Sequence, residues 1–392
     1  MKFRLLLVFA FVSVTLFSAA PEELMNRKLY ILTWRGVQEK PNENLFYSPY
    51  SIQQAMGMLS LGASGKTKEQ IDQVFGFTPE SFEWFAKNKQ ILSGKNQTFF
   101  FQTNLILADR NLKYDPAFRN SAGKYFDGNF LLLDFVFKSR ITALLNRMIA
   151  VRSGNLIKDP FSEHDFSPEM IMLLANILAF KAPWEFEFDK SRTTSQPFLS
   201  AGQKKTTVEL MHQKSFLPYF HDASKKIHGV SLPYKDNRFE MIILMTTKPE
   251  VDVSVIPQAL SEGALEKWSK AFSDKKQTNL YFPKFKLSVK TDFSELLKSC
   301  GVRDAFLLTK ADFSRLGNEN LCVDNILHIA QIEVDETGTE AAAATVIPVV
   351  EKAAAPAGSH YFRVDRPFCF LIRYKPANAI LFLGVIHQLP GK

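Results

Sequence analysis

A run of small residues near the end of the chain constrains its fold more than any other feature. Gly338 opens the run, and small side chains continue to Thr345, interrupted only by Glu340. If the run is a strand, alternate side chains point to opposite faces of a sheet. The small face would then carry Thr339, Ala341, Ala343 and Thr345. Such a strand could enter an existing sheet without displacing much core, which suits a segment that begins as a loop and later becomes a strand.

Two simpler interpretations of this run are open. Alanine is the best helix former, so residues 340–345 could form one turn of helix. The run could also belong to a low-complexity linker together with the alanine-rich residues 353–358. Composition alone does not separate these interpretations from an insertable loop, so the decision depends on the rest of the chain.

The overall composition indicates a soluble globular protein. Of the 392 residues, 46% are hydrophobic and 22% are charged, and 36 phenylalanines indicate a large aromatic core. The three cysteines, Cys300, Cys322 and Cys369, are too few for a disulfide scaffold. We expect buried free thiols, and one bridge plus one free thiol is the alternative.

The first twenty residues have the pattern of a secretory signal peptide. Lys2 and Arg4 form a basic start, and the apolar run 5–17 is too short to span a membrane. Small residues at positions 18–20 suit cleavage, although Pro21 leaves the exact bond open. No later apolar stretch is long enough to span a bilayer, so we expect a secreted, extracellular and soluble protein with no membrane partner.

The net charge of the chain is modestly positive. Removing residues 1–20 takes away Lys2 and Arg4, so the formal net charge falls from +8 to 8 − 2 = +6. This charge favours acidic partners such as sulfated polysaccharide, although it is spread along the chain. A polar helix predicted over Ser81–Leu92 carries Lys87 and Lys89, and Lys95 follows it; an ordinary solvated surface is the alternative interpretation. Asn96 begins the only Asn-x-Ser/Thr sequon, and a secreted chain makes it a predicted glycosylation site.

Motifs elsewhere in the chain are more specific than composition. The segment Asn44–Ile52 is followed by a Gly-Ala turn within Gly62–Thr67, and the apolar run Met170–Phe180 is followed by Trp184. The pattern is completed by Tyr281–Lys286, His328–Glu336, Arg366–Phe370 and Leu381–Gly384. Together with the run from Glu336 to Thr345, these segments resemble those of the serpin family over essentially the whole mature chain.

The resemblance implies an α+β fold, the serpin fold, with a large central mixed β-sheet and two smaller sheets. It also implies about eight to nine helices and an exposed reactive-centre loop. No repeat or linker divides the chain, so we expect the signal peptide at 1–20 and a single domain over 21–392. Within that domain, residues 336–365 would form the hinge and the reactive-centre loop, and the protein is expected to be a monomer.

The resemblance further implies roles for individual residues. The hinge would comprise Glu336, Gly338, Thr339, Glu340, Ala341, Ala342, Ala343, Ala344 and Thr345, with Gly338 permitting a turn. The shutter, under the sheet where the loop must enter, would comprise Ser48, Ser51, Asn176 and His328. The breach, at the top of the sheet, would comprise Trp184, Lys284 and Glu336, with an ion pair between the last two. Ser51 could instead be a simple helix cap. Asn176 and His328 could instead be buried residues that only form structural hydrogen bonds.

No enzyme motif is found in the sequence. It contains no Gly-x-Ser-x-Gly elbow, His-Glu-x-x-His helix, Gly-x-Gly-x-x-Gly turn or phosphate loop, and no Cys or His pair has zinc spacing. We therefore expect no catalytic residue, no metal, no cofactor and no nucleic-acid partner. Because the helix that matches 81–92 binds heparin in some serpins, heparin or another sulfated polysaccharide is the candidate activator.

The activity implied by the resemblance is suicide inhibition of a serine protease. The protease would cleave the loop, remain bound as an acyl-enzyme and be distorted when the cleaved loop inserts into the main sheet. In this family the bait residue is typically the seventeenth from the hinge glutamate, which gives Lys352 and a scissile bond to Ala353. Lysine fits the acidic pocket of a trypsin-like protease. Lys352 is also the only Lys or Arg between the hinge and Arg363.

Several alternatives to this activity stay open. Pro348 lies in the segment that must insert, and the stretch 353–366 is long, which could shift the cleavage site. Lys352 could be an ordinary surface lysine. The main alternative function is a non-inhibitory serpin acting as a carrier, chaperone or storage protein, although such proteins tend to lack a small-residue hinge like Ala341–Ala344. An inhibitor with a basic bait residue would regulate a proteolytic cascade in haemostasis or innate immunity.

Overall fold

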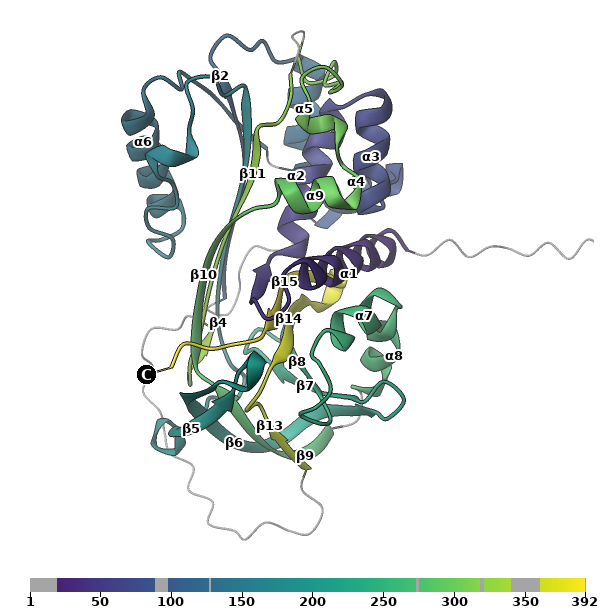
Figure 1. The fold of residues 1–392 in the computed structure, drawn as a ribbon, viewed down its shortest axis with the longest axis vertical. Coiled ribbons are helices and arrows are strands. Elements are labelled where there is room, and N and C mark those ends of the chain that lie inside the picture. Colours follow the sequence, from purple (N-terminus) through teal and green to yellow (C-terminus); the bar gives the residue numbers. More distant parts are fainter. Residues whose placement is uncertain are drawn as a thin grey trace, which may run out of the picture.

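One long β-sheet runs along most of the molecule in the computed structural model (Figure 1). The structure describes residues 20–88, 98–126, 128–272, 275–317, 321–339 and 360–391. The six strands of this main sheet, in order across it, are β10 (Phe285–Asp292), β11 (Asn325–Val334), β12 (Gly338–Thr339), β4 (Met172–Pro183), β2 (Phe99–Asp109) and β3 (Asn129–Leu133).

The centre of the main sheet is formed by β4 and β11, which pair in parallel over residues 325–331 of β11. The apolar run of β4 is buried from Met172 to Phe180, as expected for a strand covered on both faces. Beyond this stretch β12 lies between the two strands, where Thr339 pairs with Val334 on one side and Ala182 on the other. The main sheet is therefore closed over most of its length and opened by a wedge at the carboxyl ends of β4 and β11.

The remaining nine strands form the two smaller sheets of the expected fold, which here share one long strand, β6. Their order is β1-β15-β14-β8-β7-β6-β9-β13, with β5 paired to the first half of β6. The bounds are β1 (Leu45–Tyr47), β15 (Ala379–Ile386), β14 (Phe368–Tyr374), β8 (Phe239–Thr246), β7 (Ile227–Pro233), β6 (Lys205–Asp222), β9 (Lys275–Pro283), β13 (His360–Arg363) and β5 (Thr194–Leu199). The 18-residue β6 pairs with β9 and then with β7, which makes the two sheets continuous.

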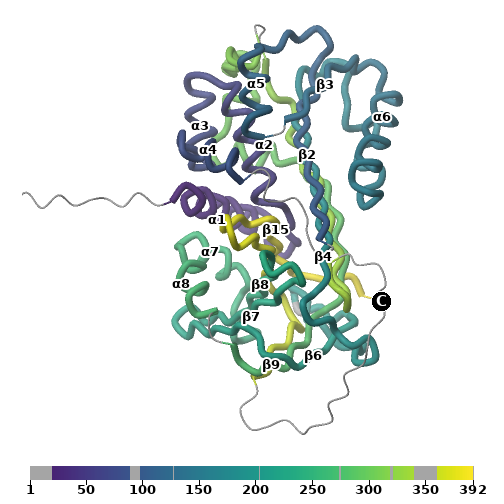
Figure 2. The backbone as a smooth tube through the Cα atoms, turned by 180° about the vertical axis from the view of Figure 1, so that it is seen from behind, coloured from purple at the N-terminus to yellow at the C-terminus, as the bar shows by residue number. Residues whose placement is uncertain are grey.

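Nine α-helices fall within the described residues, and the prediction of about eight to nine is confirmed. They are α1 (Pro21–Glu39), α2 (Pro49–Gly62), α3 (Gly65–Phe75), α4 (Pro79–Asn88), α5 (Pro116–Phe126), α6 (Lys138–Arg152), α7 (Val255–Ser261), α8 (Ala264–Ala271) and α9 (Ser294–Cys300). Figures 1 and 2 show α6 on one face of the main sheet and α2, α3, α4, α5 and α9 on the other.

Alternation along β4 explains how both faces of the main sheet are covered. Leu173 and Ile177 pack in one apolar cluster with Ile141 and Leu145 of α6. Leu174 belongs to the other cluster, which includes the buried residues of α2. Because successive strand side chains point to opposite faces, a continuous apolar run is needed wherever helices lie on both sides.

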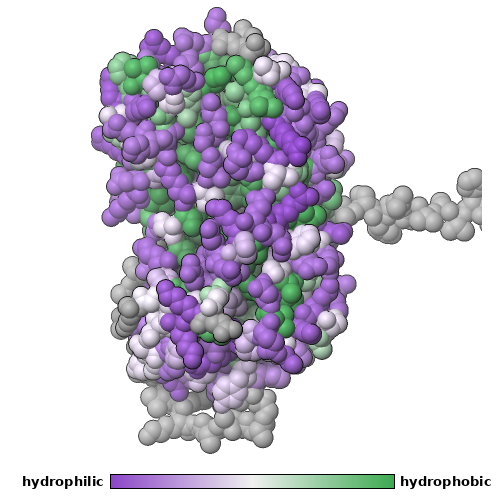
Figure 3. Space-filling model, viewed as in Figure 1, coloured by the Kyte–Doolittle hydropathy of each residue, from purple (hydrophilic) through white to green (hydrophobic). Residues whose placement is uncertain are grey.

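The surface and the cysteines complete the description of the fold. Hydrophilic side chains cover most of the face seen in Figure 3, and hydrophobic groups break it in a few places. All three cysteines are free; Cys322 and Cys369 are buried, whereas Cys300 is half-buried. In the part of the chain that the structure describes, no helix has the length and apolar character needed to cross a membrane.

Candidate functional site

The wedge in the main sheet is made by the first residues of the small-residue run. The Thr339 side chain is fully buried, and its hydroxyl lies 2.7 Å from the Tyr234 hydroxyl, with which it shares a hydrogen bond. Gly338 lies so close to β4 that an added Cβ would come within 2.2 Å of the Ala182 carbonyl oxygen. Its φ is outside the left-handed range. The glycine is therefore required for the close approach of two backbones, at the tight connection in which the Asp335 backbone N–H donates to the Gly338 carbonyl at 2.9 Å.

Glu336 fixes the start of the wedge through two side-chain partners. Lys284 Nζ lies 3.0 Å from Glu336 Oε2, and the Thr193 hydroxyl donates to Glu336 Oε1 at 2.8 Å. Burial by itself would raise the pKa of Glu336, but hydrogen bonds from its own backbone, Lys284 and Thr193 outweigh burial and lower it. Burial by itself would lower the pKa of Lys284, but the hydrogen bond to Glu336 and its negative charge raise the pKa of Lys284 overall. The two charged forms stabilise each other at neutral pH.

Trp184 holds the backbone of the same segment. Its backbone N–H donates to the Thr337 carbonyl and its indole Nε1 donates to the Asp335 carbonyl, both at 3.0 Å. The indole stacks on the Tyr234 ring with centroids 4.6 Å apart. The Asp335 carboxylate in turn accepts from the backbone N–H groups of Thr337 at 2.8 Å and of Gly338 at 3.1 Å. Trp184, Lys284 and Glu336 thus meet at one end of the main sheet, as the resemblance implied.

The four residues assigned to the shutter meet under the closed part of the sheet. The Ser48 backbone N–H donates to His328 Nε2 at 3.0 Å, so the proton is on Nδ1, which donates to Asn176 Oδ1 at 2.7 Å. His328 is fully buried, and burial lowers its pKa to about 3, which keeps the ring neutral. His328 of β11 and Asn176 of β4 are register partners, so their hydrogen bond directly crosses the seam between the two central strands.

Further polar residues, which the sequence analysis missed, extend this shutter network. Asn176 Nδ2 donates to the Ser51 carbonyl at 3.1 Å and also to Asn104 Oδ1. Asn104 donates to Gln54 Oε1 at 3.2 Å, and Gln102 donates to the same oxygen. The network therefore links β11, β4, β2 and α2.

The helix cap at the start of α2 differs from the simple alternative considered for Ser51. Ser48 is the N-cap residue, and its hydroxyl accepts from the Ser51 backbone N–H at 3.1 Å. The Ser51 hydroxyl is buried without a hydrogen-bond partner among the described residues. Ser51 therefore contributes backbone groups to the shutter network, whereas Ser48 supplies the cap.

The geometry defines what the sheet can do. A strand added between β4 and β11 would push them apart by roughly one strand spacing, about 4.8 Å. The hydrogen bond between His328 and Asn176 could not survive that separation. The shutter network consequently holds the sheet closed, while Gly338 and Thr339 already occupy the position from which an additional strand would continue.

Several predicted residues lie outside the described part of the chain. These are the signal peptide residues 1–19, Lys89, Lys95, Asn96, the hinge residues Glu340, Ala341, Ala342, Ala343, Ala344 and Thr345, and the bait residues Lys352 and Ala353. Lys87 is described, and it is exposed in the last turn of α4.

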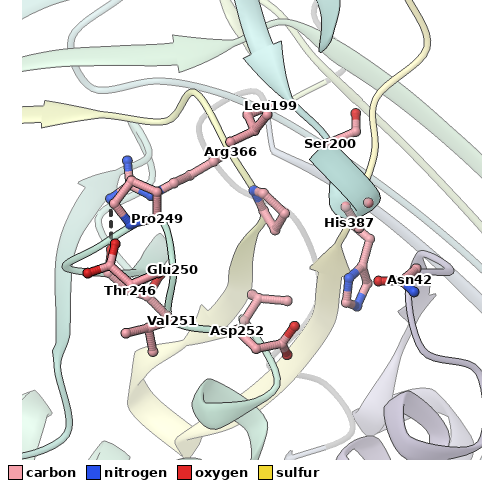
Figure 4. A pocket seen from close by; sticks show the side chains of 14 residues that line it. Asn42, Leu199, Ser200, Thr246, Pro249, Glu250, Val251, Asp252, Arg366 and His387 are labelled. Carbon is pink, nitrogen blue, oxygen red and sulfur yellow. Dashed lines mark hydrogen bonds between the residues drawn. The ribbon is translucent and has the colours of Figure 1, made fainter. Parts of the chain in front are cut away.

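A separate pocket of about 170 Å³ shares no residue with the hinge, shutter or breach (Figure 4). Arg366 lines it and donates to the Thr246 carbonyl at 2.8 Å. The Ser200 hydroxyl and His387 Nε2 are in its walls, closed off from solvent and without a partner among the described residues. This pocket therefore lies apart from the site built by the hinge, shutter and breach residues.

The described residues thus form a main sheet whose central strands are joined by a polar network and separated at one end by β12. Comparison with known proteins places this architecture: the chain belongs to the serpin family, because the family model described as serpin (serine protease inhibitor) matches residues 31–389.

Relatives and solved structures agree with this assignment. Human glia-derived nexin is 29% identical over 365 residues, covering 90% of this chain and 89% of the nexin. Iripin-5 of Ixodes ricinus is 28% identical over 376 residues, covering 93% of this chain and 94% of Iripin-5. The crystal structure of native protease nexin-1 with heparin has a TM-score of 0.83 at 27% identity. The match covers 94% of this chain and 99% of the nexin-1 chain. The structure of human thyroxine-binding globulin has a TM-score of 0.84 at 27% identity. The match covers 95% of this chain and 100% of the globulin chain.

Proposed function

We propose that this chain is a secreted suicide inhibitor of trypsin-like serine proteases. The observation that carries the proposal is the position of β12. Its two residues already lie between β4 and β11, and the small side chains that follow them in the sequence can continue along the same path. Inhibitory members of the family act through such an insertion, which converts an exposed loop into a central strand.

The reaction begins as ordinary proteolysis. The protease serine attacks the carbonyl carbon of Lys352, the peptide bond to Ala353 breaks, and the new amine leaves with a proton from the protease histidine. Lys352 is then joined to the protease serine as an ester. Hydrolysis of that ester would release the protease, so inhibition requires a faster step that disables it.

Loop insertion supplies that faster step. Once the peptide bond is broken, the segment from Glu340 to Glu351 is free to extend β12 along the seam, and the shutter network opens to admit it. The new strand gains backbone hydrogen bonds to both neighbours and carries the acylated protease with it. Misplacement of catalytic groups by about 1 Å already costs roughly 100-fold in rate, so the ester persists.

The identity of the bait residue directs specificity. A lysine side chain pairs with the carboxylate in the pocket of trypsin-like proteases. Secretion, suggested by residues 1–20, would place the inhibitor and glycosylated Asn96 outside the cell, in a haemostatic or immune cascade. The protein would act there as a monomer.

A sulfated polysaccharide is the proposed activator. Lys87 is exposed on α4, and Lys89 and Lys95 follow it in the sequence. A similar protein, protease nexin-1, was solved with heparin. If heparin binds here, it will accelerate complex formation with a protease, and replacing the three lysines by glutamine will abolish the acceleration but leave the basal rate unchanged.

Incubation of the mature chain with trypsin tests the central proposal. We expect a complex that survives SDS, and a released carboxyl-terminal fragment that begins at Ala353. Loop insertion should also raise the melting temperature of the cleaved protein well above that of the intact one. Quantitative cleavage without a complex would instead favour a carrier function, which the similarity to thyroxine-binding globulin makes the second candidate.

A further inference from the structure

The outer face of α6 exposes an unusual number of large hydrophobic side chains. Phe137 at the N-cap is 52% exposed, Leu144 is 55% exposed and Val151 is 72% exposed. Val136, just before the helix, is 64% exposed. Figure 3 shows hydrophobic groups breaking the hydrophilic surface over the upper end of α6, where the helix begins. Contiguous exposed apolar groups are uncommon on soluble monomers and indicate an interaction surface.

Arginines alternate with these apolar residues along one line. The positions Phe137, Arg140, Leu144, Arg147 and Val151 are separated by three or four residues in turn, the spacing that places side chains on a single helix face. At 1.5 Å per residue the line is about 21 Å long. We call these five residues the α6 outer stripe.

The inner side of α6 already supplies the contacts that the fold requires. Ile141, Leu145 and Ile149 are buried in the cluster that covers the main sheet. Phe137, Leu144 and Val151 belong to neither apolar cluster, so α6 also carries apolar side chains outside its buried side. A helix needed only as a cover for the sheet would carry polar residues on its outer side.

The charged side chains of α6 itself are all positive. α6 contains Lys138, Arg140, Arg147 and Arg152 and no acidic residue. Arg140, Arg147 and Arg152 form no ion pair with any residue that the structure describes. In the neighbouring segments, Asp134 pairs with Arg110 at 2.8 Å and Asp165 pairs with Lys290. Glu163 lies beside the first turn of α6, where it accepts from the Ser139 hydroxyl at 2.7 Å.

We propose that the α6 outer stripe docks on an anionic phospholipid bilayer, with the helix lying in the plane of the membrane surface. Exposed aliphatic and aromatic groups can enter the boundary between headgroups and acyl chains, while arginines between them pair with phosphate and carboxylate groups of the lipids. A sulfated polysaccharide would match the arginines but would gain nothing from Leu144 and Val151. The interleaving of the two residue kinds is what favours a bilayer.

Flotation of the full mature chain with lipid vesicles tests this proposal. We expect binding to vesicles of phosphatidylcholine mixed with phosphatidylserine, weakening as salt is raised, and much weaker binding to phosphatidylcholine alone. A Phe137→Trp variant provides a second readout, because its fluorescence should shift to the blue when the ring leaves water. Equal binding to both kinds of vesicle, or none to either, would overturn the proposal.

Two pairs of substitutions separate charge from apolar contact. Each basic residue near an anionic surface contributes about fivefold to binding, so Arg140→Gln with Arg147→Gln should weaken it about thirtyfold. Leu144→Gln with Val151→Gln should weaken it about tenfold, since each side chain would bury part of its apolar surface. The matched control, Arg315→Gln with Lys375→Gln, removes two exposed charges outside α6 and should bind vesicles normally.

The outcomes also distinguish other partners. The Arg140→Gln, Arg147→Gln variant could lose vesicle binding while the Leu144→Gln, Val151→Gln variant binds fully. That result would indicate a purely electrostatic partner such as a polysaccharide, and would refute membrane docking. Inhibition of trypsin in solution should be the same for all three double variants. This inference is therefore tested independently of the proposed inhibitory function.

Discussion

Replacing Asn176 by alanine is the sharpest test of the idea that a polar network holds the main sheet closed. The side chain crosses the seam between the two central strands, where it accepts from His328 Nδ1 and donates to Asn104 Oδ1 and to the Ser51 carbonyl. Alanine would leave His328 Nδ1 and Asn104 Oδ1 without a partner, whereas the Ser51 carbonyl, which lies within α2, can still accept a hydrogen bond inside the helix. Each unpaired group costs about 1–3 kcal/mol, so the intact protein should lose about 2–6 kcal/mol of unfolding free energy.

The same substitution should cost less after the loop has been cleaved. In the cleaved form a new strand would separate β4 from β11, so the bond to His328 is already broken in the unsubstituted protein. Of the two groups that would be left without a partner, only Asn104 Oδ1 then remains, which reduces the expected cost to about 1–3 kcal/mol. Asn176→Ala should consequently destabilise the intact form about twice as much as the cleaved form.

Equilibrium unfolding in guanidinium chloride, followed by tryptophan fluorescence, measures both costs. The matched control is Asn26→Ala, because Asn26 is also buried but donates to the Asn378 carbonyl at 2.8 Å, outside the main sheet. It should destabilise the intact and cleaved forms equally. An equal loss in both forms for Asn176→Ala, or a loss below about 1 kcal/mol in the intact form, would refute the reasoning.

Three further predictions concern the wedge, the inserting segment and acid stability. Glu336→Gln removes the ion pair with Lys284 but keeps the size of the side chain; since Lys284 is partly exposed, we expect a loss of about 1 kcal/mol at neutral pH. The pKa of Glu336 is lowered in the folded state, so the ion pair stabilises the folded protein above the ordinary carboxyl pKa and ceases to do so as the pH falls below about 4. Unfolding curves of the unsubstituted protein and of Glu336→Gln, recorded over this pH range, measure the difference. Ala343→Arg should turn the inhibitor into a substrate, seen on SDS gels as cleavage by trypsin without a complex, whereas the conservative Ala343→Ser should still form one. Burial lowers the pKa of His328 to about 3, so the unfolded chain binds a proton that the folded chain excludes between about pH 6.5 and 3; stability should fall across that window, and His328→Gln should flatten the slope.

The sequence was sufficient for those features that depend on local pattern. The apolar run Met170–Phe180, one of the segments that resemble the serpin family, forms most of β4, which lies at the centre of the main sheet. Small residues from Gly338 onward predicted a segment able to enter that sheet, and its first two residues are inside it. In both cases the side chains themselves carry the information, because burial on two faces and close backbone approach each demand particular residue types.

Features that depend on strand register could not be predicted from the sequence. Asn104 is the register partner of Asn176, and Gln54 of α2 accepts from Asn104, so their roles follow from packing that no local pattern encodes. The one available signal was the pair Gln102 and Asn104, two residues apart within the buried part of β2. Polar residues in such a strand need partners on the covering element.

The place of β14 and β15 in the smaller sheets has a consequence for biosynthesis. These two strands are the last in chain order, yet β14 lies between β15 and β8 in the interior of the sheet, and every residue of β15 is buried. A ribosome delivers them only after all the other strands have emerged. Until then, β1 and β8 of the nascent polypeptide lack the strands that lie between them in the finished sheet. During that interval their unpaired edges are accessible to chaperones and can pair wrongly with a second nascent copy.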